Sequence, residues 1–581
     1  MRITRKTMKP ISNRAIAELL REIGEYLAMQ NVPFKPRAYE KAADAIDSIE
    51  EEVSEIYKVG GIKALEEIPG VGVSIGEKIE EFLKTGRIAY YEQLKKKAPV
   101  DLSELAKVEG LGPKSIKQLY EKLGVQNLAD LEKSARAGKI AKLPGFGQKS
   151  EEKILKGISF AKSFGGRFVL GSVMPAIRAI EDRLRKLPGV EKIIVAGSVR
   201  RRKETVGDAD ILIISKKAPP IMDSFVAMPE VASVIAHGET KSSVKLASGI
   251  NVDLRVVPAE SYGAALNYFT GSKEHNVALR AQAMQKGWKL NEYGLFKGEQ
   301  RIAGKTEEEL YEKFGMDYIE PELRENTGEL VAAVKHELPK LIGYGDLHGD
   351  LQVQTDWTDG ADSIETMAKT AIAHGLKYIA ITDHTKRLAM THGLDEKRIL
   401  KQMAEIDRLN KKFAGKIKIL KGSECDILRD GSLDLPDGVL AKLDVVGVAV
   451  HSLFNLSRKD QTERIRRAIT NPNADILFHP TGRIINRRAA YDIDIDDLIA
   501  TAKRTGTIME IDAFPDRLDL KDEHIRKCVA AGVQMAIDSD AHSAAHFAVL
   551  EYGIAQARRG WAEKGDIINA WSLDKMLKYL K

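Results

Sequence analysis

The chain has 581 residues, of which 43% are apolar and 30% charged, and its formal net charge is +6. That length exceeds what one hydrophobic core supports, so we expect roughly three to five domains. No apolar run is long enough to cross a bilayer, and the charged start MRITRKTMKP lacks the apolar segment of a signal peptide, so we expect a cytoplasmic protein without a membrane partner. Only two cysteines are present, Cys425 and Cys528, which excludes a disulfide framework and a cysteine-rich zinc site.

A glycine pattern repeats in the first third of the chain, after an amphipathic helix predicted at residues 12–29. It reads IPGVG at 68–72, VEGLG at 108–112 and LPGFG at 143–147, each before a helix-compatible segment. Two glycines tolerate the positive φ of a tight turn. The free backbone N–H groups at the start of the following helix can bind a DNA phosphate whatever the base sequence. One copy would be typical of a plain αα-hairpin, but three copies favour helix-hairpin-helix DNA binding. The glycines expected at DNA are Gly70, Gly72, Gly110, Gly112, Gly145 and Gly147.

Three acidic residues are predicted to meet on one face of a sheet. In IIVAGSVRRRKETVGDADILIIS, residues 193–215, two strand-like runs flank a polar loop, and Asp208 and Asp210 are two residues apart, so both point to one face. The strand-like INVDLRVVP at 250–258 supplies Asp253. Carboxylates this close repel one another unless cations neutralise them. The pattern therefore suits two Mg²⁺ or Mn²⁺ ions that activate a 3′-hydroxyl and hold a triphosphate, although an Asp-x-Asp pair can also be merely solvated.

The segment GSVRR at 197–201 adds groups that can bind phosphate. Gly197 and Ser198 offer backbone and hydroxyl groups, and Arg201 can offset charge on a departing pyrophosphate. Together with GDAD, VDLRVVP and LNYFTGSKEHNVALRAQAMQKGWKLNEYG, this segment resembles the family X DNA polymerases, of which polymerase beta is the familiar member. The resemblance covers about residues 1–335.

The resemblance implies a template-directed, gap-filling polymerase of base-excision repair that acts on gapped or primer-template DNA with dNTPs. It implies that Asp208, Asp210 and Asp253 hold the two metals. The residues implied for the triphosphate, the sugar and the nascent base pair are Gly197, Ser198, Arg201, Arg167, Tyr268, Phe269, Gly271, Asn276 and Arg280. Minor-groove acceptors lie at nearly the same place in every correct pair, so the last two residues would test shape rather than sequence.

The N-terminal region resembles that family's lyase domain, which removes a 5′-deoxyribose phosphate through a lysine Schiff base. Lys78 matches the place of the nucleophile, and Lys35 and Tyr39 match its phosphate-side neighbours. Ser74 stands where the family has another lysine, and one lost cation weakens the expected grip on a 5′-phosphate. The alternative for Lys78 is a surface lysine on a DNA-facing helix.

From residue 346 onward, short apolar strands alternate with helices, and nine of the twelve histidines lie at or beyond His348. The predicted strands are KYIAITDH, KIKILKGSECDI, DVVGVAVHS, ADILFHP, GTIMEIDA and VQMAIDSDAH. Most end in a charged or imidazole side chain, and the carboxyl ends of strands are where an α/β barrel gathers its site residues. Imidazoles mixed with carboxylates suit Zn²⁺ or Mn²⁺ and a metal-bound hydroxide attacking phosphorus.

This region resembles the polymerase-and-histidinol-phosphatase (PHP) domain that many bacterial and archaeal family X polymerases carry at their C-terminus. The family usually presents nine ligands to a three-metal cluster, and seven of them are matched by Asp359, His384, Glu424, His451, His479, Asp540 and His542. The opening pair of histidines is replaced by Gln352 and Gln354 in the predicted loop GDLHGDLQVQTDWTDG at 345–360. A shifted register would put His348 and Asp350 in those places instead.

We therefore expect a PHP metal site in which the metal bridged by the missing pair is weakly bound or absent. The domain would then be either a weakened 3′–5′ exonuclease and abasic-site endonuclease or a scaffold that holds DNA. Two rivals for the whole chain are a nucleotidyltransferase acting on RNA or a small acceptor and a non-catalytic DNA-binding scaffold. We expect a monomer.

The expected fold is multidomain α+β and α/β. It comprises a lyase-like helical domain with a helix-hairpin-helix at 1–88, a second helix-hairpin-helix subdomain at 89–163 and a nucleotidyltransferase palm with a mixed β-sheet at 164–258. A nascent-base-pair subdomain follows at 259–335, then a linker at 336–345 and a distorted (β/α) PHP barrel at 346–581.

Overall fold

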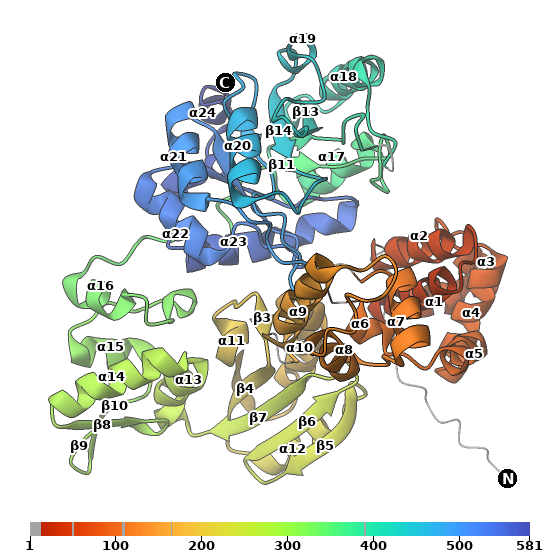
Figure 1. Cartoon of the computed structure of the whole chain (residues 1–581). Helices are drawn as coiled ribbons and strands as arrows, with labels where there is room; N and C mark the ends of the chain where they lie inside the picture. The colour runs from red at the N-terminus through yellow and green to blue at the C-terminus, as the bar shows by residue number, and fades with distance from the viewer. Residues whose placement is uncertain are drawn as a thin grey trace. The chain divides into compact units, whose positions relative to one another are not determined.

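The computed structural model describes residues 13–48, 52–106, 108, 111–163, 166–388 and 391–580. The chain divides into two compact units (Figure 1). Unit 1 comprises residues 1–165 and 484–490, and unit 2 comprises residues 166–483 and 491–581. Within the described ranges, every helix is too short or too polar to span a lipid bilayer.

The first 163 residues of unit 1 are helical wherever they form regular structure that is described. The helices are α1 (Asn13–Met29), α2 (Lys35–Ser48), α3 (Val53–Glu66), α4 (Val73–Thr85), α5 (Ala89–Lys97), α6 (Leu102–Leu105), α7 (Pro113–Leu123), α8 (Leu128–Arg136) and α9 (Gln148–Ser163). The predicted apolar face of α1 is buried, with Ile16, Leu20, Ile23 and Leu27 in the unit's hydrophobic core. Burial of this stripe explains why an amphipathic helix opens the described chain.

The three glycine repeats each lead into a helix, α4, α7 and α9, as predicted. Gly70 and Gly145 have φ of +81° and +82°, whereas Gly72 and Gly112 have φ of −86° and −83° and precede the first residues of α4 and α7. The positive φ that two glycines allow is thus used by the first glycine of the repeat at 68–72 and at 143–147, and not by Gly72 or Gly112. A Cβ at the second glycine would meet no heavy atom within 4 Å, so that glycine instead leaves the helix start open. Gly110 lies outside the described residues.

A five-stranded mixed sheet forms the first part of unit 2, in the strand order β2-β4-β7-β6-β5. Strands β4 and β7 are parallel and the other neighbours are antiparallel. The strands are β2 (Val190–Val195), β4 (Asp208–Ser215), β5 (Val231–His237), β6 (Lys241–Leu246) and β7 (Asn251–Val257), with α10 (Leu170–Arg185), α11 (Gly197–Arg200) and α12 (Ala218–Val226) packed on them and a small pair of β1 (Phe168–Val169) and β3 (Thr205–Val206) beside them. The mixed palm sheet is confirmed.

The next part of unit 2 has a small hydrophobic core of its own that includes Leu279, Leu310 and Tyr311. Its elements are η1 (Ala259–Ser261), α13 (Tyr262–Thr270), α14 (Lys273–Gln285), a three-stranded antiparallel sheet of β8 (Trp288–Asn291), β9 (Gly294–Lys297) and β10 (Gln300–Ala303), then α15 (Glu307–Phe314), η2 (Pro321–Leu323) and α16 (Glu329–Lys335).

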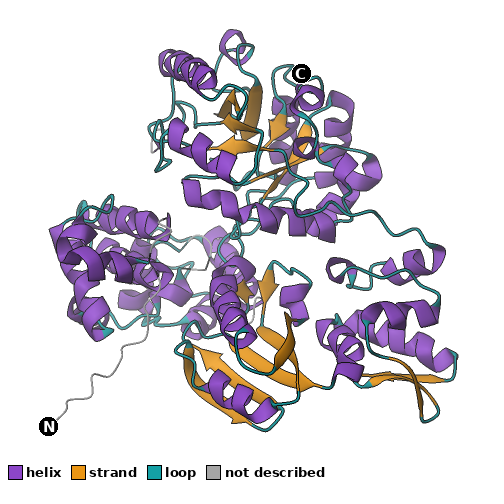
Figure 2. Cartoon of the chain, turned by 180° about the vertical axis from the view of Figure 1, so that it is seen from behind, coloured by secondary structure: helices purple, strands orange, loops and turns teal. Residues whose placement is uncertain are grey.

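The C-terminal part is a seven-stranded parallel barrel surrounded by helices (Figure 2). Its strands are β11 (Gly349–Val353), β12 (Tyr378–Ile381), β13 (Lys418–Asp426), β14 (Val445–Ala449), β15 (Ile476–Leu477), β16 (Ile508–Asp512) and β17 (Met535–Asp538). The helices are α17 (Ile364–Ala373), α18 (Glu396–Lys412), α19 (Asp437–Leu440), α20 (Arg458–Ile469), α21 (Ile495–Thr505), α22 (Asp522–Ala531), α23 (Leu550–Arg559) and α24 (Leu573–Leu577). The ring is nearly closed, because Gln354 N donates to Ala541 O at 2.8 Å just beyond β17.

All six predicted strands are present, but residues 349–353 form a seventh, β11, where a loop was expected. The alternation Asp-Leu-Gln-Val-Gln is that of a strand, and all of its side chains are buried. Because Asp350, Gln352 and Gln354 are buried although polar, the segment looked too hydrophilic in sequence to be a barrel strand.

Candidate active sites

The three predicted carboxylates of the palm lie together. Asp210 on β4 stands directly opposite Asp253 on the parallel neighbour β7, and Asp208 lies two residues before Asp210 on the same strand. Burial, with the negative charges of Asp208 and Asp253, raises the pKa of Asp210 to about 6. Lys241 Nζ lies 3.2 Å from Asp253 Oδ2 and offsets part of the charge. The predicted crowding of these side chains is confirmed, and their metal-binding role stays a prediction.

The start of α11 lies directly against this cluster. Gly197 has a φ of +65°, and a Cβ there would lie 2.8 Å from Asp210 Oδ2, so only glycine fits. Ala196 N also donates to Asp210 O at 2.7 Å, which fixes the turn to the strand. Ser198, the next residue, is half-buried in α11. The Gly-Ser pair is thus beside the carboxylates, where a triphosphate would need it.

The arginines predicted to bind triphosphate already have partners. Arg201 Nε donates to Glu325 Oε1 at 3.0 Å, and its Nη1 donates to Thr270 O. Arg167 Nε donates to Thr205 Oγ1 at 3.1 Å. A triphosphate would therefore have to draw Arg201 away from a carboxylate.

The residues predicted to contact the sugar and the nascent base are linked to one another by ring contacts and hydrogen bonds. The rings of Tyr268 and Phe269 meet edge to face at 5.1 Å. Asn276 Nδ2 donates to Tyr268 O at 2.7 Å, and Arg280 Nε donates to Asn276 O at 3.2 Å. Gly271 has a φ of +69°, and a Cβ there would lie 3.0 Å from Arg201 Nη1. This segment therefore connects the predicted base contacts to the predicted triphosphate contact.

Lys78, the predicted lyase nucleophile, lies on α4 of unit 1. Its Nζ donates to Ser74 O at 2.8 Å and to Ser74 Oγ at 2.9 Å, and it lies 5.1 Å from the centre of the Tyr90 ring. Burial, reinforced by the positive charge of Lys35, lowers the pKa of Lys78. Tyr39 is buried in the core of the unit. A lowered pKa favours the neutral amine that a Schiff base requires.

Glu424 is the centre of the PHP cluster. Its Oε1 lies 2.9 Å from His451 Nε2 and 2.8 Å from His479 Nε2. Its Oε2 accepts hydrogen bonds from Gln352 Nε2 at 3.2 Å and Gln354 Nε2 at 2.8 Å. The two glutamines therefore lie where the sequence placed them, at the ligand cluster, but they present amide N–H groups to the carboxylate.

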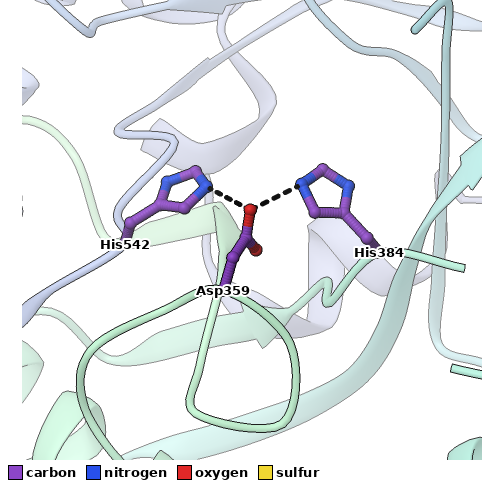
Figure 3. Close-up of side chains that lie close together, drawn as sticks. All are labelled: Asp359, His384 and His542. Atoms are coloured by element: carbon purple, nitrogen blue, oxygen red, sulfur yellow. Dashed lines mark ion pairs between the residues drawn. The ribbon is translucent and has the colours of Figure 1, made fainter. Parts of the chain in front are cut away.

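A second group of ligands lies at the mouth of the barrel (Figure 3). Asp359 Oδ2 is 3.7 Å from His384 Nε2 and 3.8 Å from His542 Nε2. These three side chains offer ligand atoms within 4.8 Å of one another, as do His384, Glu424 and His451. His542 Nδ1 also lies 2.8 Å from Asp540 O. Six of the seven matched ligands thus belong to these two groups or contact Glu424 directly, and Asp540 adjoins them.

These groups fit metal ions at two of the three expected places. His384 Nδ1 is buried, makes no hydrogen bond within the described part of the chain and lies 3.5 Å from Glu424 Oε2, so it can serve as a metal ligand. At the corner of Gln352 and Gln354 both Nε2 groups donate to Glu424, whereas Gln352 Oε1 and Gln354 Oε1 are buried without a hydrogen-bond partner in the described structure, so this corner offers a metal two neutral amide oxygens in place of imidazoles. The shifted register was wrong, since His348 Nδ1 bonds Trp571 O at 3.0 Å instead.

Two residues of this cluster were missed in the sequence. Asp426 Oδ1 lies 3.2 Å from His451 Nδ1 and can fix the orientation of that ring. Arg517 Nε lies 3.8 Å from Asp540 Oδ2 and brings a permanent positive charge to the cluster. Asp426 could have been found, because it is two residues after Glu424 and therefore on the same face of β13.

Four family profiles match the chain. Their descriptions are a helix-hairpin-helix domain at residues 11–88, a SAM-like helix-hairpin-helix tandem at 102–159, a DNA polymerase beta thumb at 265–325 and a PHP domain at 350–479. The chain is 39% identical over 571 residues to the DNA polymerase/3′-5′ exonuclease PolX of Bacillus subtilis (strain 168). The aligned region covers 97% of this chain and 99% of that protein. The chain belongs to the PolX family of DNA polymerases.

Two other relatives match shorter parts of this PolX-family chain. DNA polymerase lambda of Rattus norvegicus is 25% identical over 343 residues, covering 54% of this chain and 56% of that protein. A probable phosphatase of Thermoanaerobacter sp. (strain X514) is 31% identical over 230 residues, covering 38% of this chain and 88% of that protein. The predicted resemblance to family X polymerases with a PHP domain is confirmed.

Proposed function

We propose that the chain is a template-directed, gap-filling DNA polymerase of base-excision repair. The observation that carries this function is the placement of Asp210 opposite Asp253, with Asp208 on the same strand, beside the Gly197-Ser198 turn. Three carboxylates this close together, with their charge only partly offset by Lys241, favour the binding of divalent cations. We assign Mg²⁺ or Mn²⁺ to this cluster. PolX membership and the helix-hairpin-helix profiles support DNA as the substrate.

The reaction is attack of a primer 3′-hydroxyl oxygen on the α-phosphorus of a dNTP, with the P–O bond to the pyrophosphate broken. Divalent cations, when bound, supply activation of the hydroxyl and neutralisation of the leaving charge. Asp208, Asp210 and Asp253 hold that charge in place from two adjoining strands. Gly197 and Ser198 bind phosphate oxygens, and so do the guanidinium groups of Arg201 and Arg167.

The segment from Tyr268 to Gly271 bounds the sugar, and its backbone leaves little room for a 2′-hydroxyl. Asn276 and Arg280 read the minor-groove side of the new pair. The test is primer extension on gapped DNA with dNTPs compared with rNTPs, and dNTP incorporation preferred by at least about tenfold supports the polymerase. Equal use of rNTPs, or transfer to a small acceptor alone, would favour the rival nucleotidyltransferase.

A second activity is favoured by the PHP ligand groups. We assign to them a 3′–5′ exonuclease, with abasic-site cleavage as a related reaction, acting through Zn²⁺ or Mn²⁺ held by the groups around Asp359 and Glu424. Gln352 and Gln354 leave the third metal weakly bound or absent, so the activity is weak. Metal analysis of purified protein with an exonuclease assay tests this: Mn²⁺-dependent degradation lost in His451→Ala supports it, and metal-free protein without cleavage leaves only the scaffold.

The lyase rests on Lys78. Its amine would attack the C1′ of a 5′-deoxyribose phosphate, and the Schiff base formed with loss of water could be trapped by borohydride. The control is Lys114, the second residue of α7, which follows the second glycine repeat as Lys78 follows the first. Trapping lost in Lys78→Ala but kept in Lys114→Ala supports this role, and equal trapping in both variants would leave Lys78 a DNA-facing lysine. Binding of dNTPs, a monomeric state and a cytoplasmic location stay predictions.

A further inference from the structure

Helix α23 of the barrel contacts the polymerase part of unit 2 through its final residue. Arg559, at the end of α23, has a side chain only 3% exposed. Its Nη2 donates to Asp522 Oδ2 at 2.5 Å on α22 of the PHP part. Its Nη1 donates to Glu325 Oε1 at 3.1 Å and to Arg201 O at 3.0 Å, both in the polymerase part. A buried guanidinium thus connects the PHP barrel to the backbone of a predicted triphosphate-binding residue.

Glu325 has two arginine partners on one oxygen. Its Oε1 accepts from Arg201 Nε at 3.0 Å as well as from Arg559, and Lys203 Nζ lies 3.7 Å from its Oε2. Burial alone would raise the pKa of Glu325, but the positive charges of Arg559, Arg201 and Lys203 hold it below its usual range. Glu325 is therefore a charged carboxylate, and its hold on Arg201 is shared with Arg559.

This sharing affects how readily Arg201 can bind a phosphate. A carboxylate and a triphosphate compete for the same guanidinium donors. If Arg559 were absent, Glu325 would lose its second arginine, and its charge would be shared only between Arg201 and Lys203, so it would hold Arg201 more strongly. Arg559 itself cannot leave, because Asp522 fixes its other nitrogen.

We propose that Arg559 is a positioning residue for nucleotide binding: by engaging Glu325 and the backbone of Arg201, it keeps the Arg201 side chain available to the dNTP triphosphate. The PHP domain thereby supports the polymerase reaction whatever its own metal content. The inference rests on the proposed polymerase function and on the assignment of Arg201 to the triphosphate.

The test is single-nucleotide insertion on gapped DNA by the full-length protein, with KM for dNTP and kcat measured separately. Arg559→Gln is expected to raise KM by about tenfold, the effect of losing one charge-assisted contact, with kcat within about twofold of wild type. Adding Glu325→Gln to Arg559→Gln removes the competing charge and is expected to return KM to that of Glu325→Gln alone. A loss of fold would not be rescued in this way.

Arg558→Gln is the matched control. Arg558 is the neighbouring arginine of α23, and its Nε donates to Glu322 Oε1 at 2.8 Å, but it makes no contact with Arg201 in the described structure. It is expected to leave KM unchanged. An equal rise of KM in Arg558→Gln, an unchanged KM in Arg559→Gln, or no rescue by Glu325→Gln would each overturn the inference.

Should Arg559→Gln fail to fold, Glu325→Gln alone provides the second measurement and is expected to lower KM by about twofold or more. A KM that does not fall would contradict the competition between Glu325 and the triphosphate. The two kinds of failure give different results. If the proposed polymerase function is wrong, the wild-type protein inserts no dNTP; if only the role of Arg559 is wrong, the wild-type protein inserts dNTP and the variants do not show the expected changes in KM.

Discussion

The palm cluster and the PHP cluster contain similar side chains but have opposite charge balances. In the palm, Asp208 and Asp253 face Asp210 with Lys241 as a close cation, and burial together with that repulsion raises the pKa of Asp210 to about 6. In the barrel, burial would raise the pKa of Glu424 as well, yet the imidazoles around it hold that pKa well below its usual range. The positive charge near the palm carboxylates is too small to reverse the rise in the pKa of Asp210, whereas the imidazoles of the barrel more than offset the burial of Glu424.

The difference shows where each site depends on metal. Lys241 offsets only part of the negative charge of the palm carboxylates, so the rest must be neutralised by cations from solution. Glu424 already accepts hydrogen bonds from Gln352 and Gln354, so a metal at that corner must displace two donors and gains only neutral amide oxygens in return. We therefore expect the polymerase reaction to fail without metal and the PHP reaction to be weak even with it.

The largest expected effect tests the palm. Asp253→Ala removes one carboxylate from the cluster and should lower nucleotide insertion by at least about 100-fold, because the remaining pair holds cations poorly. Primer extension with Mg²⁺ measures it. Asp223→Ala is the control, since Asp223 on α12 is 72% exposed and pairs only with His237 within the described structure. Insertion retained in Asp253→Ala would remove the basis of the comparison.

The next effect tests the barrel. The double change Gln352→His and Gln354→His replaces two amide donors by imidazole ligands, so bound metal should rise by about one ion per chain and exonuclease activity by roughly tenfold or more. Metal content by mass spectrometry and degradation of a labelled strand measure the two changes. Adding His451→Ala should abolish the gain in cleavage. An unchanged metal content in the double variant would show that the missing pair is not what limits the site.

The local sequence pattern was enough to predict the palm cluster. Asp208 and Asp210 are two residues apart on one strand and so share a face, and the strand-like segment around Asp253 indicates a neighbouring strand. The rule that short apolar runs between helical segments form strands located the six later barrel strands. It failed at β11, where polar side chains are buried against other polar side chains and mimic a loop. The repeat glycines were found, but their φ values depend on how each helix begins, which composition does not reveal.

Two of the residues that contact Arg201, Glu325 and Arg559, could not be predicted. Glu325 and Arg559 are far away in sequence, and neither belongs to a motif. Only the packing of α23 in unit 2 brings them together. Contacts of this kind depend on tertiary structure, whereas ligand sets at strand ends depend on periodicity and can be read from sequence.

The smallest effect is one of stability, and its sign differs between the two clusters. The pKa of Asp210 is raised from 3.8 to about 6, so its proton stabilises the fold at low pH, and that contribution is lost as pH rises through about 6. Without metal at pH 8, Asp210→Asn should therefore have a free energy of unfolding about 1 to 2 kcal/mol higher than wild type after allowance for partial exposure.

Glu424→Gln should be less stable than wild type at the same pH, because the lowered pKa of Glu424 stabilises the fold above about 4.5. Thermal unfolding in EDTA at pH 8 and pH 4 measures both differences. The Asp210→Asn difference should shrink at pH 4, whereas the Glu424→Gln difference should largely persist there, because Glu424 stays charged until the pH falls through its own lowered pKa. Mg²⁺ should then stabilise wild type more than Asp210→Asn, since only wild type gains a neutralised carboxylate, and a destabilised Asp210→Asn in EDTA would mean that the palm carboxylates do not repel one another.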